Sequence, residues 1–231
     1  RMRACQWSGR SGKGLEKIAL TPFSSALLAW YFVAVWGAGY VATKIGLQYA
    51  PPFTFLTLRF AFGLLCLLPV VLLWKPRWPA TRAGWAHLAV VGLLMHAAQL
   101  GGSHYAQYLG MSAGVSALIL SCQPLLTAFI AAYFLHERLK PGQWLGVFVG
   151  LAGVALVVWH KLDIRELTIG SLLGSLIALA SVTAATLYQR RFAPQVDLKA
   201  AAVIQFATAA VLVTPLALAL EGFQYTSSWV L

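Results

Sequence analysis

Acidic side chains are scarce in this sequence, which has 6 Asp and Glu residues against 17 Lys and Arg residues. All of them fall in the N-terminal tail or between long apolar runs, at Glu16, Glu137, Asp163, Glu166, Asp197 and Glu221. Charged residues of both signs make up 10% of the chain, whereas soluble domains have roughly a quarter. The apolar runs therefore contain no carboxylate that could carry a proton or bind Na⁺.

Patterns typical of catalytic and metal sites are missing as well. The 3 cysteines, Cys5, Cys66 and Cys122, have no metal-ligand spacing, and two of them lie inside apolar runs. We interpret them as packing residues and expect no disulfide. The chain has no phosphate-binding glycine loop and no Ser-His-Asp arrangement. The sequence therefore argues against an enzyme and predicts no cofactor and no metal.

Hydrophobic residues, in contrast, make up 60% of the chain, and the mean hydropathy is +0.75. Seven apolar runs come close to the ~20 residues that a helix needs to cross a bilayer. They are Ser25–Val41, Phe53–Trp74, Gly84–Leu109, Ala113–Leu135, Gln143–His160, Ile169–Leu187 and Ala200–Leu220. The pattern predicts an all-α polytopic membrane protein that has the lipid bilayer as its surroundings.

The basic residues set the expected orientation. The net charge of +11 would suit nucleic-acid binding, but Lys and Arg are spread singly over short loops, so no nucleic-acid partner is expected. They collect in the tail and in the loops after the second, fourth and sixth runs, all on one side of the membrane. By the positive-inside rule, the N-terminus lies in the cytoplasm and Glu221 lies outside.

Ordered motifs along the chain carry a family resemblance. A Pro, an apolar helix, a Glu-Arg-Leu turn and a Gly-rich helix follow one another between Ser121 and Val157. This stretch resembles the end of one repeat in the EamA-type drug/metabolite transporter superfamily. The matching positions are Trp36, Gly37, Lys44, Pro52, Arg59, Pro69, Pro124, Glu137, Arg138, Gly146, Gly150 and Gly153. The resemblance covers residues 24–231 and implies a transporter of a bacterial-type inner membrane that moves amino acids, metabolites or drugs outward.

The fifth apolar run has small residues at regular intervals. Gly142, Gly146 and Gly150 follow at four-residue spacing, with Gly153 one turn further on. Small residues at this interval form a groove along a helix, where a neighbouring backbone can approach closely. We therefore expect these glycines to be helix-packing positions.

An internal repeat suggests how the helices are arranged. Phe55–Ala61 aligns with Ala201–Ala207, and the same shift brings Pro69 onto Pro215. The shift spans five helices, so the second copy would enter the membrane from the opposite side, as in the inverted repeats of secondary transporters. We expect seven of ten helices here, with a tail (1–23), a first repeat (24–160) and a truncated second repeat (161–231). Chance similarity between apolar helices is the alternative.

The third run carries a polar stripe. Gly92, His96, Gln99, Ser103 and Gln107 share one face of a straight helix with 100° per residue. Such a face must turn toward protein or water, so the stripe is expected to line a cavity. Hydrogen bonds between helices are the alternative, and His96 alone could equally be a structural histidine.

Four further residues are candidates for substrate contact. Trp36 and Tyr40 lie four residues apart on one face and could stack on a substrate, although aromatic stripes often serve packing. Arg59 lies about 10 Å into its helix and could neutralise an anionic substrate, with snorkelling to the interface as the alternative. Gln123 stands beside Pro124, which interrupts a helix.

Taken together with the family resemblance, which implies the outward direction and the substrate class, these observations predict a secondary transporter that exports a small metabolite, amino acid or drug-like compound by alternating access. The expected substrate-binding residues are Trp36, Tyr40, Arg59, His96, Gln99, Ser103, Gln107 and Gln123. A facilitator or channel on the same scaffold is the nearer alternative, and a heptahelical receptor the more distant one. The sequence leaves open whether the protein forms a homodimer.

Overall fold

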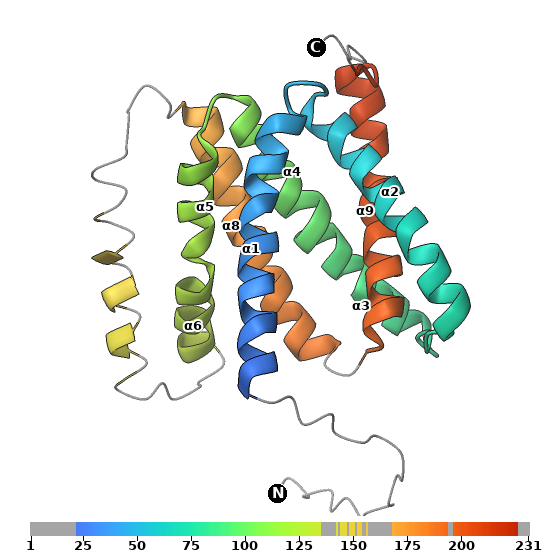
Figure 1. Ribbon diagram of the computed structural model, residues 1–231, viewed down its shortest axis with the longest axis horizontal. Helices are drawn as coiled ribbons and strands as arrows, with labels where there is room; N and C mark the ends of the chain where they lie inside the picture. Colours follow the sequence, from blue (N-terminus) through green and yellow to red (C-terminus); the bar gives the residue numbers. More distant parts are fainter. Residues whose placement is uncertain are drawn as a thin grey trace, which may run out of the picture. The chain divides into compact units, whose positions relative to one another are not determined.

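The computed structural model describes residues 22–134, 142, 144–146, 148–150, 152–153, 156, 168–193 and 196–225. All regular structure in these ranges is helical, as the all-α prediction requires. The chain divides into two compact units, Arg1–Ala38 and Gly39–Leu231. Figure 1 labels the helices.

Helix α1 (Pro22–Gly46) contains the boundary between the two units and covers the predicted run Ser25–Val41. Its residues up to Ala38 are the described part of the first unit, where Trp36 is 61% exposed. The end of α1 belongs to the second unit, and there Thr43 is buried.

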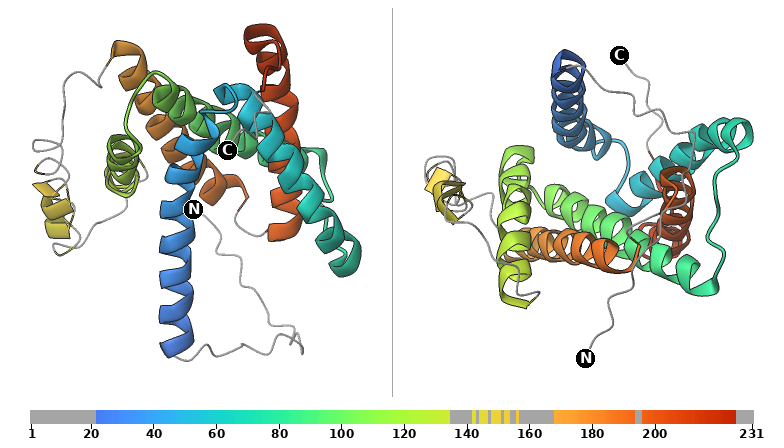
Figure 2. Two further views of the ribbon diagram at one scale, coloured as in Figure 1. Left: turned by 45° about the horizontal axis from the view of Figure 1, so that its top comes forward. Right: turned by 90° about the horizontal axis from the view of Figure 1, so that it is seen from below.

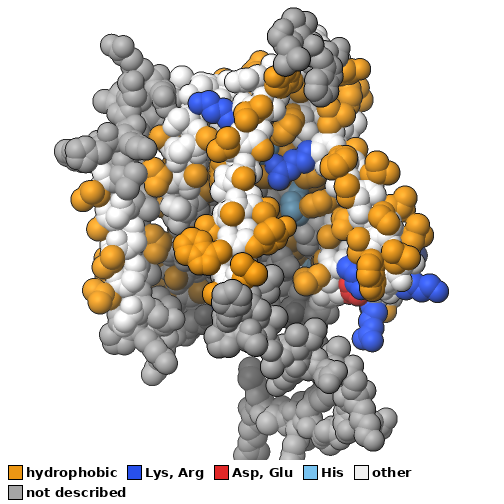
Figure 3. Space-filling view, in the orientation of Figure 1, with side chains coloured by type: hydrophobic (Ala, Val, Ile, Leu, Met, Phe, Trp, Pro, Cys, Tyr) orange, Lys and Arg blue, Asp and Glu red, His pale blue; other side chains and the backbone are white. Residues whose placement is uncertain are grey.

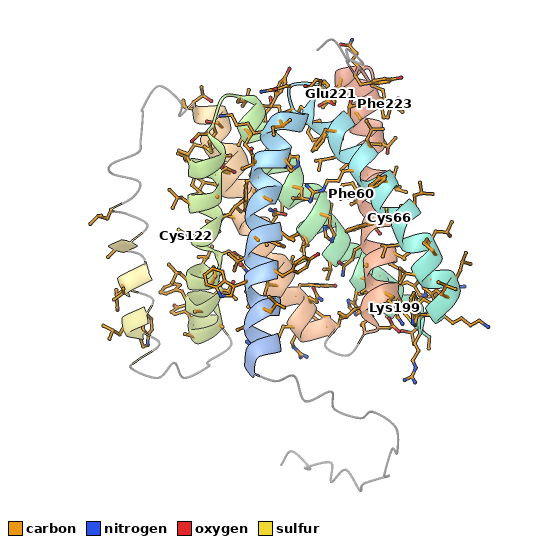
Figure 4. All side chains as sticks on the ribbon, in the orientation of Figure 1. Phe60, Cys66, Cys122, Lys199, Glu221 and Phe223 are labelled. Carbon is orange, nitrogen blue, oxygen red and sulfur yellow. The ribbon has the colours of Figure 1, made fainter. Side chains whose placement is uncertain are left out.

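The second unit contains an antiparallel pair, α2 (Pro52–Trp74) and α9 (Leu198–Glu221). The Glu221 carboxylate at the end of α9 accepts hydrogen bonds from backbone N–H groups at the start of α2. At the other end, Asp197 just before α9 accepts one from the backbone N–H of Arg77, just after α2. The helices therefore run in opposite directions, and Figure 4 shows Lys199 and Glu221 at opposite ends of α9.

Apolar side chains fill the contact between these two helices. Leu56 and Phe60 of α2 form one buried cluster with Ala209 and Val213 of α9. Burying side chains of this size against each other contributes on the order of 2 kcal/mol each relative to exposure in water, although lipid lowers this gain. Close packing therefore holds the pair together.

A second helix pair crosses with its backbones in contact. Helices α3 (Arg82–Gly92), η1 (Leu93–Ala98) and α4 (Gln99–Tyr108) follow one another without a break, and α8 (Ile169–Phe192) runs beside α4 in the views of Figure 2. A methyl group on Gly102 would lie 2.5 Å from the carbonyl oxygen of Gly174. A methyl group on Gly174 would lie 2.8 Å from the carbonyl oxygen of Gly102. Only glycine at both positions permits this approach.

Segment η1 is a π-helix, with hydrogen bonds from residue i to i+5 in place of i+4. Such a turn holds one residue more than an α-helical turn. Gly92 and Ser103 would lie about 20° apart around a straight helix, but the extra residue separates them by about 80°. The straight-helix geometry assumed for the polar stripe is therefore wrong at this turn.

The fourth predicted run, Ala113–Leu135, is broken in the middle. It forms α5 (Ala113–Ser121) and α6 (Gln123–Phe134), with a turn at Cys122. Pro124 explains the break, since its ring clashes with the carbonyl group four residues earlier and it has no N–H to donate. The Ser112 hydroxyl caps the start of α5 by accepting from the N–H of Val115.

Five helices of the described chain are long and apolar enough to cross a membrane. They are Pro52–Trp74, Arg82–Tyr108, Ala113–Tyr133, Ile169–Phe192 and Leu198–Glu221. Each matches a predicted run to within a few residues. The predicted run Gln143–His160 lies largely outside the described residues.

The predicted glycine groove has few neighbours in the part that the structure describes. A methyl group on Gly142, Gly146 or Gly153 would meet nothing within 4 Å, and one on Gly150 would lie 3.3 Å from Leu125. The groove stays a prediction. Close backbone contacts between described helices lie instead between Gly102 and Gly174 and between Gly92 and Gln205.

Basic side chains gather at one end of the α2–α9 pair, where Figure 3 shows Lys and Arg around an acidic side chain. Lys199 Nζ donates to the carbonyl oxygen of Trp74, and Asp197 caps α9 by accepting from the N–H of Lys199. The backbone N–H of Arg77, together with Lys199, holds the pKa of the Asp197 carboxyl below its usual value. Loops far apart in sequence thus form one basic surface.

Candidate substrate site

His96 lies in the π turn and faces α9. Its Nε2 is 3.2 Å from Oε1 of Gln205. Because an amide oxygen can only accept, His96 donates through Nε2. The imidazole ring lies edge-on to Phe206 at 4.9 Å and to Phe60 at 6.2 Å between ring centroids. Side chains of three segments, α2, η1 and α9, therefore meet at His96.

Gly92 lets the π turn approach α9 closely. A methyl group on Gly92 would lie 2.8 Å from both the Cα atom and the carbonyl oxygen of Gln205. Gln205 itself is buried, and the sequence analysis did not select it. The signal that could have found it was available, since Gln205 aligns with Arg59 in the internal repeat and is a polar residue at membrane depth.

His104 forms a second polar contact, two turns further along. Its Nε2 is 3.3 Å from the hydroxyl oxygen of Thr43 at the end of α1. The Thr43 hydroxyl donates to the carbonyl oxygen of Gly39 at 2.8 Å, so it accepts from His104. Phe55 of α2 lies against the imidazole, with ring centroids 5.8 Å apart. The sequence analysis missed His104 because it does not share the face assigned to the polar stripe.

The other members of the polar stripe are buried among helices. The Ser103 hydroxyl lies 3.2 Å from that of Ser116 in α5, and Gln99 is buried. Gln107 is 8% exposed, and neither atom of its amide has a hydrogen-bond partner in the described chain. His96 and Ser103 thus contact different helices, as the extra residue of the π turn requires. Their role in lining a cavity stays a prediction.

The remaining candidates are Gln123, Tyr40, Trp36 and Arg59. Gln123 donates from Nε2 to the Thr186 hydroxyl at 3.2 Å, which links α6 to α8. Tyr40 is half-buried in the second unit, whereas Trp36 belongs to the first unit. Their shared role stays a prediction. Arg59 is exposed on α2, between the two positions whose rings contact His104 and His96.

The side chains of this group are cationic or neutral. The charge of Arg59 acts on both His96 and His104. The two acidic residues that the structure describes, Asp197 and Glu221, lie at the ends of α9 and bind backbone N–H groups. No group of three His, Cys, Asp or Glu residues is placed to hold a metal ion in the described ranges. The polar side chains of this group can donate hydrogen bonds to a polar molecule and accept them from it.

Comparison with curated proteins gives relatives that are all named as transporters or efflux pumps. A "Probable amino-acid metabolite efflux pump" of Salmonella typhimurium is 28% identical over 165 residues, which cover 71% of this chain and 52% of that protein. The protein of the same name in Escherichia coli K12 is 29% identical, covering 67% and 48%. An "Uncharacterized inner membrane transporter YedA" of the same strain is also 29% identical, covering 60% and 44%.

The chain thus spans about half the length of these curated relatives. No solved structure matches it. Residues 19–159, well over half of the chain, match the EamA-like transporter family. The chain belongs to the EamA-like transporter family of membrane proteins.

Proposed function

We propose that this protein is a secondary transporter that exports a small metabolite across the inner membrane by alternating access. One observation carries the proposal. The two segments that repeat in sequence form the antiparallel pair α2 and α9, in which Phe60 and Phe206, at equivalent positions, contact each other. Inverted repeats that pack in this way can rock against each other around a fixed site.

The contacts next to Phe60 and Phe206 support this placement of the site. A methyl group on Gly63 would lie 2.9 Å from the ring of Phe206, and Ala209, the equivalent of Gly63, packs in one cluster with Phe60. His96 lies against both phenylalanine rings. A polar side chain at the boundary between two repeats is where the substrate sites of such transporters are found.

The outward direction rests on the relatives, two of which are named as amino-acid metabolite efflux pumps. The whole protein would then consist of two five-helix repeats of opposite topology, with the division near residue 160. We assign the site to Arg59, His96, Gln99, Ser103 and Gln107, and we add His104 and Gln205 from their contacts. Trp36, Tyr40 and Gln123 remain candidate substrate residues.

We also propose that the N-terminus lies in the cytoplasm. The basic surface formed by Lys75, Arg77, Arg82 and Lys199 lies at one end of the helices, and Glu221 lies at the other. This separation fits the positive-inside rule. A cytoplasmic reporter fused after Trp78 should be active, and one fused after Asp163 should be inactive. The opposite result at both positions would overturn the orientation.

Transport by the purified complete gene product in proteoliposomes tests the function. With a panel of labelled amino acids and an imposed pH gradient, we expect at least one compound to move against its own gradient. Gln205→Leu, which removes the partner of His96, should lower the rate by about tenfold or more while thermal stability changes little, since a hydrogen bond between membrane helices contributes only about 0.6 kcal/mol on average. Gln224→Leu, at the exposed end after α9, is the matched control.

Two results would count against the proposal. Movement of substrate only down its gradient would identify a facilitator on the same scaffold. Movement of no compound by a well-folded protein would contradict transport of this substrate class.

A further inference from the structure

Arg59 is a cation within a membrane-crossing helix. It follows Pro52, the first residue of α2, by seven positions, or about 10 Å along the helix axis. Phe55, one turn earlier, contacts the ring of His104, and Phe60, the next residue, contacts that of His96. Arg59 is therefore bracketed by the two polar contacts of the candidate site.

This cation has no anionic partner in the described chain. No hydrogen bond or ion pair joins Arg59 to any residue there. The Glu221 carboxylate, at the end of α9, lies beside the start of α2. It already accepts hydrogen bonds from the N–H groups of Phe53 and Thr54 and from the Thr54 hydroxyl, at 2.7–2.9 Å. Asp197 lies at the far end of the helix pair. An unbalanced charge at membrane depth is costly and is usually retained for a function.

The neighbouring imidazoles do not balance the charge of Arg59. His96 donates to Gln205 and His104 donates to Thr43, each through Nε2. The one N–H hydrogen of each neutral ring is therefore already in a hydrogen bond. A neutral imidazole with this hydrogen bond offers no negative charge to a cation. The site therefore presents a guanidinium group among neutral polar atoms and aromatic rings.

We propose, building on the transport function above, that Arg59 anchors the carboxylate of the substrate. The site then takes small carboxylates with an apolar or aromatic body and rejects organic cations. A planar guanidinium matches a carboxylate with two parallel hydrogen bonds, which a lysine cannot reproduce. The half-buried ring of Phe55, one turn before Arg59 on the same helix, offers apolar surface on the same side.

Organic cations are excluded by the same charge. Aromatic rings attract cations, and the phenylalanines would do so if they stood alone. Repulsion between Arg59 and a second cation at similar distance is stronger than this attraction in a medium of low dielectric constant. The described residues of this site therefore do not balance the charge of an amine that has no carboxylate.

Three probes that each carry one phenyl ring but differ in charge test the proposal: 3-phenylpropionate, L-phenylalanine and 2-phenylethylamine. Binding to the purified chain is measured by quenching of tryptophan fluorescence, and transport is measured in proteoliposomes. We expect the wild type to bind 3-phenylpropionate at least tenfold more tightly than 2-phenylethylamine. Arg59→Gln should abolish this preference, and Arg59→Lys should restore only part of it.

Arg82→Gln, which removes an exposed arginine at the start of α3, is the control and should keep the wild-type preference. Equal binding of acid and amine by the wild type would overturn the proposal, and this result stands even if Arg59→Gln fails to fold. A preference that survives in Arg59→Gln, or no binding of any probe, would also overturn it. Acid-selective binding without transport would leave the proposal intact and count against the transport function instead.

Discussion

Phe60 of α2 and Phe206 of α9 lie with ring centroids 5.8 Å apart, and they occupy equivalent positions when Phe55–Ala61 is aligned with Ala201–Ala207 as the predicted repeat requires. In a pair of elements related by a two-fold axis, equivalent residues touch only where they lie near that axis. In the proposed inverted-repeat arrangement, this contact would lie near the axis that relates the two helices.

A double-mutant cycle should detect this contact. Phe60→Leu and Phe206→Leu should each lower the free energy of unfolding in detergent, and together they should cost less than the sum. The expected coupling is about 0.5–1.5 kcal/mol, the range for aromatic pairs. Phe62→Leu, at a position 67% exposed on the same helix, paired with Phe206→Leu is the control and should be additive. Additive behaviour of Phe60 and Phe206 would show that the rings do not interact.

Gly102→Ala should destabilise the protein, although alanine normally favours a helix over glycine by roughly 0.5–1 kcal/mol. The added methyl group would lie 2.5 Å from the Gly174 carbonyl oxygen, and neither backbone can move away cheaply. Overpacking of this kind costs about 1–3 kcal/mol. Thermal unfolding in detergent measures the change. Gly114→Ala, where the methyl group meets nothing within 4 Å, should instead be neutral or stabilising.

Glu221→Ala should loosen the contact between the start of α2 and the end of α9. The carboxylate accepts three hydrogen bonds there, from the N–H groups of Phe53 and Thr54 and from the Thr54 hydroxyl. Loss of such a cap costs about 1–2 kcal/mol. Glu221→Gln should cost less, because its amide oxygen keeps one acceptor. If both variants unfold at the wild-type temperature, the carboxylate does not hold these ends together.

Asp197 should make stability depend on pH in the acid range. Its pKa is lowered in the folded protein, so the ionised carboxylate stabilises the fold above the unfolded value of about 3.9. This contribution is lost as the pH falls from there through the folded pKa. Asp197→Asn should therefore unfold at a lower temperature than the wild type near pH 6, and the difference should shrink below about pH 4. A difference that is constant with pH would exclude the carboxylate as its cause.

The number and bounds of the described helices could be predicted because apolar length is nearly sufficient to define a membrane span. Residues 82–108 form a continuous helix close to the predicted Gly84–Leu109, and the run that ends at Trp74 was predicted to within one residue at each end. Pro124 indicated an interruption near Cys122, although the sequence analysis did not predict that the run would divide into two helices there.

The site was harder to predict because it depends on rotation around a helix. The residues of the polar stripe were assigned to one face by a constant 100° per residue, and the π turn at Leu93–Ala98 invalidates that assumption. No residue type specifies a π turn, so the contact of His96 with Gln205 could not be foreseen. The reciprocal glycine contact was not predicted either, because Gly102 and Gly174 lie far apart in sequence and the sequence analysis did not select the glycines at four-residue spacing, Gly170 and Gly174.

The π turn also has a consequence for comparing this chain with others. A homologous chain with an ordinary α-helical turn at Leu93–Ala98 would be one residue shorter there. Aligning the two without a gap would then shift every position from Gln99 to Tyr108 by one residue, or about 100° around the helix. His104 would be matched with a residue that faces a different helix. A one-residue gap inside this turn is therefore needed before any position of the site is transferred from one relative to another.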